Sequence, residues 1–294
     1  MHRPFKTFTT LLLTLLVTTT RYAGAAPKPI RVLLADGPQK YHDFKSTTPV
    51  LKEALEKCGR FTVDLVRSPA GGSKDGSYKP DFEKYDVVVI NEGFGSHPWP
   101  EATKAAFEAY IAQGGGMVSY HAANNAWPKW EAFNKMTGLG GWGGRGKHSG
   151  PYLYMDKEGN VIRDDSAGKG GSHGPQHEFE IVNRATSHPI MKGLPATFKH
   201  GPDELYDSLR GPAENVTILA TAHSAKNKRG TGREEPVLMA ITYGKGRIFH
   251  TVLGHAVQQI KEGSFVTTFA RGTEWAATGK VTLPVPDAFP DQPF

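Results

Sequence analysis

Cysteine is nearly absent from this sequence, since Cys58 is the only one among 294 residues. An internal disulfide needs a second cysteine and is therefore excluded. Cys58 stands at the end of a helix-like pattern, so we interpret it as a small buried hydrophobic residue and not as a nucleophile. The remaining composition is ordinary, with 38% hydrophobic and 22% charged residues, which excludes a globally disordered chain.

The sequence also lacks HExxH and CxxC motifs, which excludes the compact zinc signatures. A metal site would therefore have to be assembled from residues that are distant in the sequence. The chain offers 12 histidines for this purpose. Neutral imidazoles combined with a carboxylate suit a borderline divalent metal ion such as zinc, whereas we expect no nucleotide cofactor.

A hydrophobic run long enough to cross a membrane is missing as well. Residues 11–17 are apolar except for Thr14, but a bilayer requires roughly 20 such residues. The run follows two basic residues and precedes Ala23-Gly24-Ala25, small residues of the type that signal peptidase recognises. We therefore predict that residues 1–25 are a cleaved signal peptide and that the protein is periplasmic or secreted, without stable membrane insertion. An uncleaved anchor is the alternative.

The basic charge of the chain belongs in part to this signal. The whole chain has 35 Lys and Arg against 29 Asp and Glu, a formal charge of +6. Residues 1–25 hold Arg3, Lys6 and Arg21 but no acid, so their removal leaves 32 basic residues and a charge of +3. No run of Lys and Arg with interleaved aromatic residues remains. We therefore expect no nucleic-acid partner.

Strand and helix patterns alternate through the first half of the chain. Apolar or β-branched segments predict strands at residues 30–35, 61–66, 86–90 and 117–120. Helical spacing predicts one helix that begins at Pro49, behind the cap residue Thr48, and ends before Gly59, and another over residues 101–113. This alternation indicates an α/β fold with a doubly wound, mainly parallel sheet flanked by helices.

The second half begins with a glycine-rich segment. Residues 138–174 hold 12 glycines and predict a long, loop-rich insertion, whose middle is either functional or a flexible excursion. Strands are expected at residues 179–182 and 216–222, then a hairpin at 237–243 and 247–253 and a helix at 264–277. Since no repeat or linker is present, we predict one domain over residues 26–282 and an extended tail over residues 283–294.

Polar residues are concentrated in the loops that follow the predicted parallel strands. Ligands of doubly wound sheets bind at these carboxyl ends. One such loop begins at His121, where a strand is expected to turn sharply into a helix, as around the nucleophile of hydrolases. A histidine there can be an acid, a base or a metal ligand, but it is an unusual covalent nucleophile. A buried structural histidine is the alternative interpretation.

Five segments give the sequence a family resemblance by their order and spacing. They are Tyr41-His42-Asp43-Phe44, Gly114-Gly115-Gly116 through His121-Ala122-Ala123, His188-Pro189 through Gly193-Leu194-Pro195, Asp203-Glu204-Leu205-Tyr206, and Gly244-Lys245-Gly246 through Gly254-His255. The sequence resembles the trehalose-utilisation (ThuA-like) family, whose fold is related to class I glutamine amidotransferases. The resemblance covers most of the chain after residue 25.

The resemblance implies that His121 stands where an amidotransferase has its cysteine and that His255 lies near the position of its catalytic histidine. Without a cysteine there, a Cys-His pair cannot hydrolyse glutamine, so we exclude glutamine amidotransferase activity. The resemblance instead implies sugar catabolism, with keto-glycosides or related disaccharides as substrates.

The candidate site residues fall into three groups. For catalysis they are His121, His177, Asp203 and Glu204; for substrate binding Glu92, Asn124 and Trp142; for metal binding His42 and His255. His177 is included because it leaves the glycine-rich segment and enters a strand, and His173 is secondary to it. Either acid can orient a histidine, although adjacent acids also cap helices. The metal site requires that His42, His121, His177 and His255 converge.

These groups support three hypotheses. A ketone acidifies the proton on the neighbouring carbon, so a histidine base can drive elimination of the glycosidic oxygen while a cation polarises the carbonyl. The first hypothesis is therefore an exported carbohydrate-processing lyase or hydrolase that uses His121 or His177 as base. The second is a non-catalytic protein that stacks sugar rings on tryptophans. The third is hydrolysis by paired carboxylates among Glu92, Asp203 and Glu204.

Overall fold

A computed structural model describes residues 1–2, 28–73 and 76–293 of the chain. The predicted signal peptide, residues 1–25, lies outside the described residues except for its first two. Within the described part, no helix combines the length and the apolar character that a membrane crossing needs.

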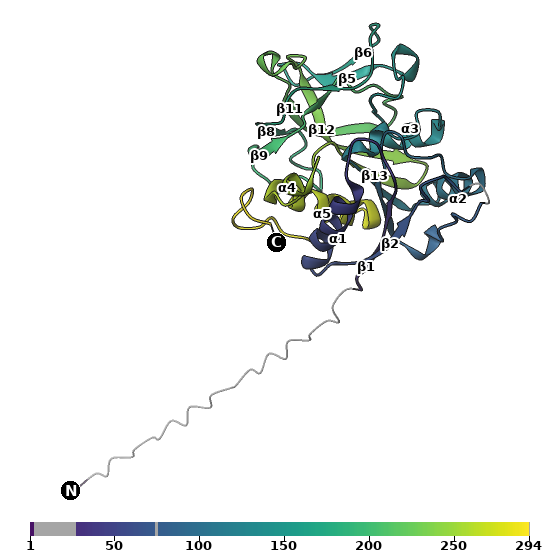
Figure 1. The fold of residues 1–294 in the computed structure, drawn as a ribbon. Coiled ribbons are helices and arrows are strands. Elements are labelled where there is room, and N and C mark those ends of the chain that lie inside the picture. The colour runs from purple at the N-terminus through teal and green to yellow at the C-terminus, as the bar shows by residue number, and fades with distance from the viewer. Residues whose placement is uncertain (3–27, 74–75, 294) are drawn as a thin grey trace.

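A mixed sheet of eleven strands forms the centre of the protein (Figure 1). Five neighbouring strands are parallel, in the order β2, β1, β3, β4 and β13. Their bounds are β1 Ile30–Asp36, β2 Phe61–Arg67, β3 Val87–Asn91, β4 Gly116–Tyr120 and β13 Gly246–Thr251. The predicted α/β fold is confirmed, because the β-branched strands of the first half are buried between helices.

Helices cover both faces of these parallel strands. On one side α1 (Phe44–Lys57), α4 (Val257–Ile260) and α5 (Gly263–Thr278) contact one another; α2 (Glu101–Ala112) and α3 (Glu131–Thr137) lie on the other. The first helix begins at Phe44 and not at Pro49. Asp43 is the reason, because its carboxylate accepts hydrogen bonds from the backbone N–H groups of Lys45 and Ser46. The Thr48 hydroxyl instead donates to Asp36.

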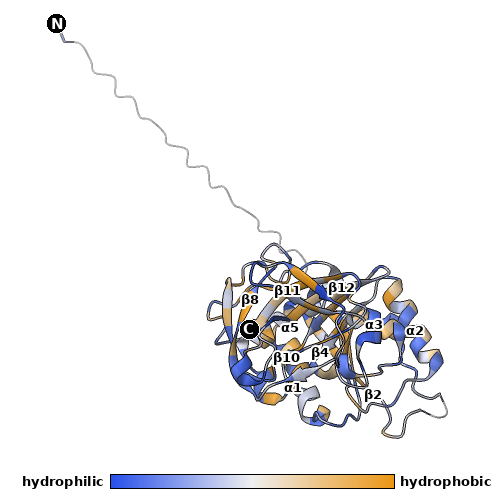
Figure 2. Ribbon diagram, turned by 90° about the horizontal axis from the view of Figure 1, so that it is seen from above, coloured by the Kyte–Doolittle hydropathy of each residue, from blue (hydrophilic) through white to orange (hydrophobic). Residues whose placement is uncertain are grey.

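Antiparallel strands extend the sheet beyond β13. From β13 the sheet continues in the order β12 (Glu234–Tyr243), β11 (Val216–His223), β8 (His177–Asn183) and β9 (Thr197–Asp203). The hairpin that we predicted around Gly244 is the pair of β12 and β13. Figure 2 shows hydrophobic residues gathered along the strands in the middle of the molecule. One continuous core therefore joins the parallel and antiparallel halves.

The glycine-rich segment is more ordered than a loop. It contains a hairpin of β5 (Tyr152–Met155) and β6 (Val161–Asp164), followed by the short strand β7 (Ser172–His173), which pairs with β10 (Tyr206–Asp207). The segment between Gly138 and Gly174 therefore forms a wall beside the carboxyl edge of the sheet.

The C-terminal tail packs against the domain through Phe289, whose ring centroid lies 5.0 Å from that of Phe198.

Candidate active site

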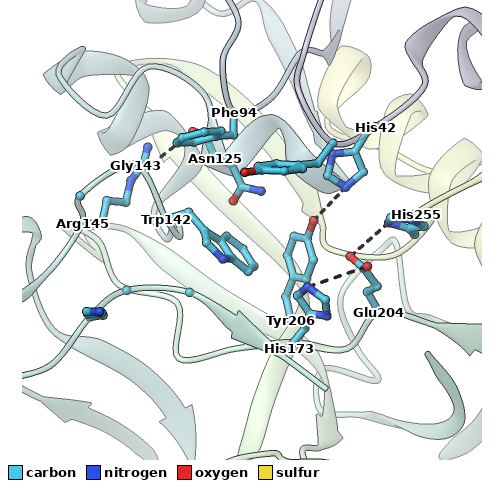
Figure 3. A pocket seen from close by; sticks show the side chains of 15 residues that line it. His42, Phe94, Asn125, Trp142, Gly143, Arg145, His173, Glu204, Tyr206 and His255 are labelled. Carbon is cyan, nitrogen blue, oxygen red and sulfur yellow. Dashed lines mark hydrogen bonds and ion pairs between the residues drawn. The ribbon is translucent and has the colours of Figure 1, made fainter. Parts of the chain in front are cut away.

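A cavity of about 900 Å³ opens at the carboxyl edge of the parallel strands (Figure 3). His42 follows β1 and His255 follows β13, so the parallel register brings both to this edge. The glycine-rich segment and the β9–β10 connection supply the opposite wall. The lining side chains include Tyr41, His42, Phe94, Asn125, Trp142, Arg145, Lys169, His173, Glu204, Tyr206 and His255.

His121 lies at the base of this site, at the turn from β4 into a short 3₁₀ helix (His121–Asn125). Its φ angle is +42°, a conformation that non-glycine residues seldom adopt and that occurs often at functional sites. The side chain is buried, and its Nδ1 lies 2.6 Å from the Val252 carbonyl oxygen. Since Nδ1 must carry the proton in that hydrogen bond, Nε2 offers its lone pair to the site.

His42 faces His121 from the loop between β1 and α1. The two Nε2 atoms are 3.2 Å apart. The Tyr206 hydroxyl oxygen lies 2.9 Å from Nε2 of His121 and 3.3 Å from Nε2 of His42. Burial, with the nearby His255 as a second cause, lowers the pKa of His42 to about 4. Burial and the neighbouring His42 also place the pKa of His121 well below its ordinary value. Both imidazoles are therefore neutral at pH 7.

Glu204 and His255 complete the cluster. The His255 Nδ1 lies 3.1 Å from a Glu204 carboxylate oxygen. This contact raises the pKa of His255. Burial alone would raise the pKa of Glu204, but the contact with His255 and the surrounding histidines lower it below its ordinary value. The carboxylate is consequently ionised at neutral pH.

Asp203 holds this part of the site together from beneath. Its buried carboxylate accepts hydrogen bonds from the backbone N–H groups of Glu204 at 2.8 Å, Gly254 at 2.7 Å and His255 at 3.2 Å. A fourth contact, at 2.9 Å, joins it to His200. Asp203 therefore fixes the backbone of two site residues that come from different strands, and it does not itself face the cavity.

The residues His42, His121, Glu204 and His255 fit a metal ion. Each offers one ligand atom, and these atoms all lie within 4.8 Å of one another. Two donors bound to one tetrahedral zinc at about 2.0–2.1 Å would lie about 3.3 Å apart, close to the separation of the two Nε2 atoms. The hydrogen bond from His121 Nδ1 to a backbone carbonyl is the usual support for a ligating histidine. The donor set suits zinc or a similar divalent ion.

Comparisons with known proteins agree with this architecture. A sequence model described as "ThuA: Trehalose utilisation" matches residues 31–276. The chain belongs to the ThuA family. A ThuA-like protein from Parabacteroides merdae ATCC 43184 is 46% identical, with a TM-score of 0.85 over 90% of this chain and 95% of that one.

A second solved structure supports the fold alone. This is a ThuA-like protein from Bacteroides uniformis ATCC 8492, 18% identical, with a TM-score of 0.57 over 90% of this chain and 97% of that one. Comparison with curated proteins found no match.

The ThuA fold brings three of the four predicted histidines together. His42, His121 and His255 meet, whereas His177 lies apart in β8, where its Nδ1 is 2.8 Å from the Pro175 carbonyl oxygen and its ring packs on Phe179. Its neighbour in the glycine-rich segment, His173, lines the cavity instead. The β7–β10 pairing explains this, because it sets His173 opposite Tyr206.

Two predicted substrate-binding residues also lie away from the cavity. Glu92 is fully buried and accepts a hydrogen bond from the Trp99 indole at 2.9 Å. Asn124 is fully buried with its amide nitrogen 3.0 Å from His250. The next residue, Asn125, lines the cavity in its place. Of the carboxylates proposed for paired hydrolysis, only Glu204 borders the cavity among the described residues.

Trp142 lies in the cavity wall, as predicted for a substrate contact. Its φ angle is +54°, and its ring centroid is 4.8 Å from that of Tyr206. Tyr206 itself was missed, although it belongs to the Asp203-Glu204-Leu205-Tyr206 segment. A tyrosine next to an apolar residue is indistinguishable from core content until the fold shows its hydroxyl between two histidines.

Proposed function

We propose that this ThuA-family protein is a metal-dependent carbohydrate-processing enzyme, a lyase or hydrolase acting on keto-glycosides or disaccharides. One observation carries the proposal: three imidazoles and a carboxylate converge at the base of a cavity with aromatic walls. A purely structural histidine cluster would not need an open cavity beside it. The cavity has room for a sugar ring next to the proposed metal ligands.

His42, His121, His255 and Glu204 would hold the ion. A bound divalent ion such as zinc supplies a Lewis acid that polarises a carbonyl group of the substrate. The four residues come from different loops of one rigid sheet, and Asp203 fixes the backbone of two of them. This support keeps the donor atoms in place before the ion binds.

Proton transfer is assigned to His173 in this proposal. Its Nδ1 lies 2.8 Å from the Gly174 carbonyl oxygen and donates to it, so the Nε2 lone pair is available to the cavity. That nitrogen is 3.8 Å from a Glu204 carboxylate oxygen, whose negative charge would stabilise the imidazolium that forms when His173 takes up a proton. His173 takes the place of His121 and His177 as the base, because His121 is assigned here as a metal ligand and His177 lies outside the cavity.

Two aromatic side chains give the cavity the character of a sugar site. Phe94 and Trp142 both line it, together with polar groups that can bind hydroxyls. Sugar rings present apolar C–H faces edged by hydroxyls, and such faces stack on aromatic rings. The family name, trehalose utilisation, agrees with a carbohydrate ligand.

The test is turnover by the purified, zinc-loaded protein. Trehalose and a trehalose derivative oxidised to a ring ketone are incubated with the protein. Chromatography then measures the released glucose and the unsaturated ketone that elimination leaves behind. We expect turnover that falls at least about 100-fold in His121→Ala and is unchanged in the control His177→Ala. Saturable sugar binding without product would instead establish a non-catalytic sugar-binding protein, and the absence of both would overturn the proposal.

We further propose that the protein is exported and that residues 1–25 are removed. The proposal rests on the basic, apolar and small-residue order of that segment. Mass spectrometry of the protein from a bacterial periplasm or culture medium should give an N-terminus at Ala26. A retained Met1 in the exported fraction would contradict cleavage.

A further inference from the structure

Asn125 carries an unused hydrogen-bonding group in the cavity wall. The residue is 4% exposed, and its Oδ1 has no hydrogen-bond partner among the described residues. A buried amide oxygen left unpaired costs about 1–3 kcal/mol, so native proteins rarely keep one without a reason. Because Asn125 lines the cavity, a ligand hydroxyl is the natural partner for this oxygen.

The surroundings fix the Asn125 backbone and the direction of its amide. The residue ends the 3₁₀ helix that begins at His121, and its carbonyl accepts a hydrogen bond of 3.4 Å from buried Arg145. Burial raises the pKa of the Tyr206 phenol, and a hydrogen bond from the Asn125 side chain partly opposes that rise. Only the amide N–H can donate to that oxygen, so this contact directs Nδ2 to Tyr206 and leaves Oδ1 as the free acceptor.

Aromatic rings line the same cavity as this acceptor. In the view of Figure 3 the Asn125 side chain lies between Phe94 and Trp142. Trp142 packs edge-on against Tyr206, with an interplanar angle of 64°, which holds its ring in one orientation. A flat apolar surface beside a single fixed acceptor is suited to a ring that carries hydroxyl groups.

We propose that Asn125 is a specificity-determining residue that accepts a hydrogen bond from one hydroxyl of a sugar ring stacked against Trp142. This inference rests on the proposed function, because it takes the ligand to be a carbohydrate. It adds that the protein selects for a hydroxyl group at one position of that ring. A site built to bind a hydroxyl discriminates strongly against the analogue that lacks it, because its buried acceptor is then left unpaired.

The test combines protein variants with deoxy sugars. Trehalose and its four symmetric dideoxy analogues, in which the same hydroxyl is missing from both glucose units, are titrated calorimetrically into wild-type protein and into Asn125→Leu, which has a similar volume but no acceptor. Wild type should bind one analogue about ten-fold more weakly than trehalose. The Leu variant should bind trehalose about ten-fold more weakly and should no longer distinguish that analogue. Asn125→Ala serves as the second variant, and circular dichroism reports folding of both.

The outcomes distinguish failure of this inference from failure of the proposed function. If wild type binds trehalose and the folded variants bind it equally well, the inference is overturned while the proposed function stands. The same holds if every deoxy penalty persists in the variants. If wild type binds neither trehalose nor its ring-oxidised derivative, the carbohydrate assignment fails and the inference fails with it.

Discussion

The Nε2 atoms of His42 and His121 lie 3.2 Å apart although 79 residues separate them in the chain. The two histidines follow β1 and β4, which are parallel and separated only by β3. Burial keeps both imidazoles neutral, and neutral imidazole is the form that binds metals. The pair is therefore prepared as two ligands of one ion before the ion arrives.

Removal of one ligand should weaken metal binding strongly. Loss of an outer-shell partner alone costs 10–100-fold in metal affinity, so His42→Ala, which deletes a direct donor, should lower zinc affinity by at least about 100-fold. Competition with a chromophoric chelator measures this. His177→Ala is the matched control, since it deletes an imidazole outside the cluster. Equal zinc affinity of His42→Ala and wild type would refute the metal site.

Asp203 should support both the fold and the site. Asp203→Ala leaves the buried N–H groups of Gly254 and His255 without their acceptor, and it should reduce the free energy of unfolding by at least about 3 kcal/mol. Zinc affinity should fall as well, because the backbone of Glu204 and His255 is released. Urea unfolding and chelator competition measure the two effects.

An exposed acid provides the comparison for Asp203. Asp81 forms a surface ion pair with Lys84, so Asp81→Ala should change the free energy of unfolding by less than about 0.5 kcal/mol. If Asp203→Ala lost stability but kept full zinc affinity, its positioning role would be disproved and only a structural role would remain.

The sequence allowed prediction of the sheet and of the loops that carry the site. Continuous β-branched strands and glycine-terminated helices are local patterns, and parallel strands place their following loops at one edge. His42 and His121 were predicted as site residues for that reason, and His255 was predicted from the family resemblance. Which further residues join them depends on pairings between segments that are distant in the chain.

Three cases illustrate what local patterns cannot give. His173 enters the site because β7 pairs with β10, two-residue strands that have no pattern of their own. Asn125 and Asn124 are adjacent and chemically identical, and only the 3₁₀ geometry after His121 decides which of them faces the cavity. Glu92 follows a parallel strand at the expected edge, but its side chain turns to the Trp99 indole.

Glu92 should make stability depend on pH. Burial raises the pKa of Glu92 to about 7, against an ordinary value of 4.5. The folded protein therefore favours the protonated form. Its contribution to stability is complete below about pH 4.5 and is lost as the pH rises through about 7. At pH 8, Glu92→Gln should exceed wild type in free energy of unfolding by up to about 3 kcal/mol.

The measurement for Glu92 is urea unfolding at pH 5 and at pH 8. The advantage of Glu92→Gln should be about 3 kcal/mol at pH 8 and less than about 1 kcal/mol at pH 5, because wild-type Glu92 is then mostly protonated in the folded state. Glu101→Gln is the control, since that side chain is 89% exposed and should leave the pH dependence unchanged. An advantage of equal size at both pH values would contradict the raised pKa.

Gly171 should be indispensable to the cavity wall. Its φ angle is +86°, and a Cβ atom there would lie 2.6 Å from the Gly141 Cα and 2.7 Å from the Trp142 backbone nitrogen. Gly159 provides a matched control, because its φ angle is +87° but nothing lies within 4 Å of its Cβ position. Both alanine variants incur the strain of a positive φ, about 1–2 kcal/mol. Crowding should add about 1–3 kcal/mol in Gly171→Ala alone.

The crowding in Gly171→Ala should also displace Trp142. Because the tryptophan forms the proposed stacking surface, trehalose binding should weaken in Gly171→Ala and persist in Gly159→Ala, while tryptophan fluorescence reports the displacement. Equal stability and equal sugar affinity of the two variants would mean that the backbone at Gly171 moves aside without cost. The wall would then be adaptable, and the fixed orientation that we assign to Trp142 would be incorrect.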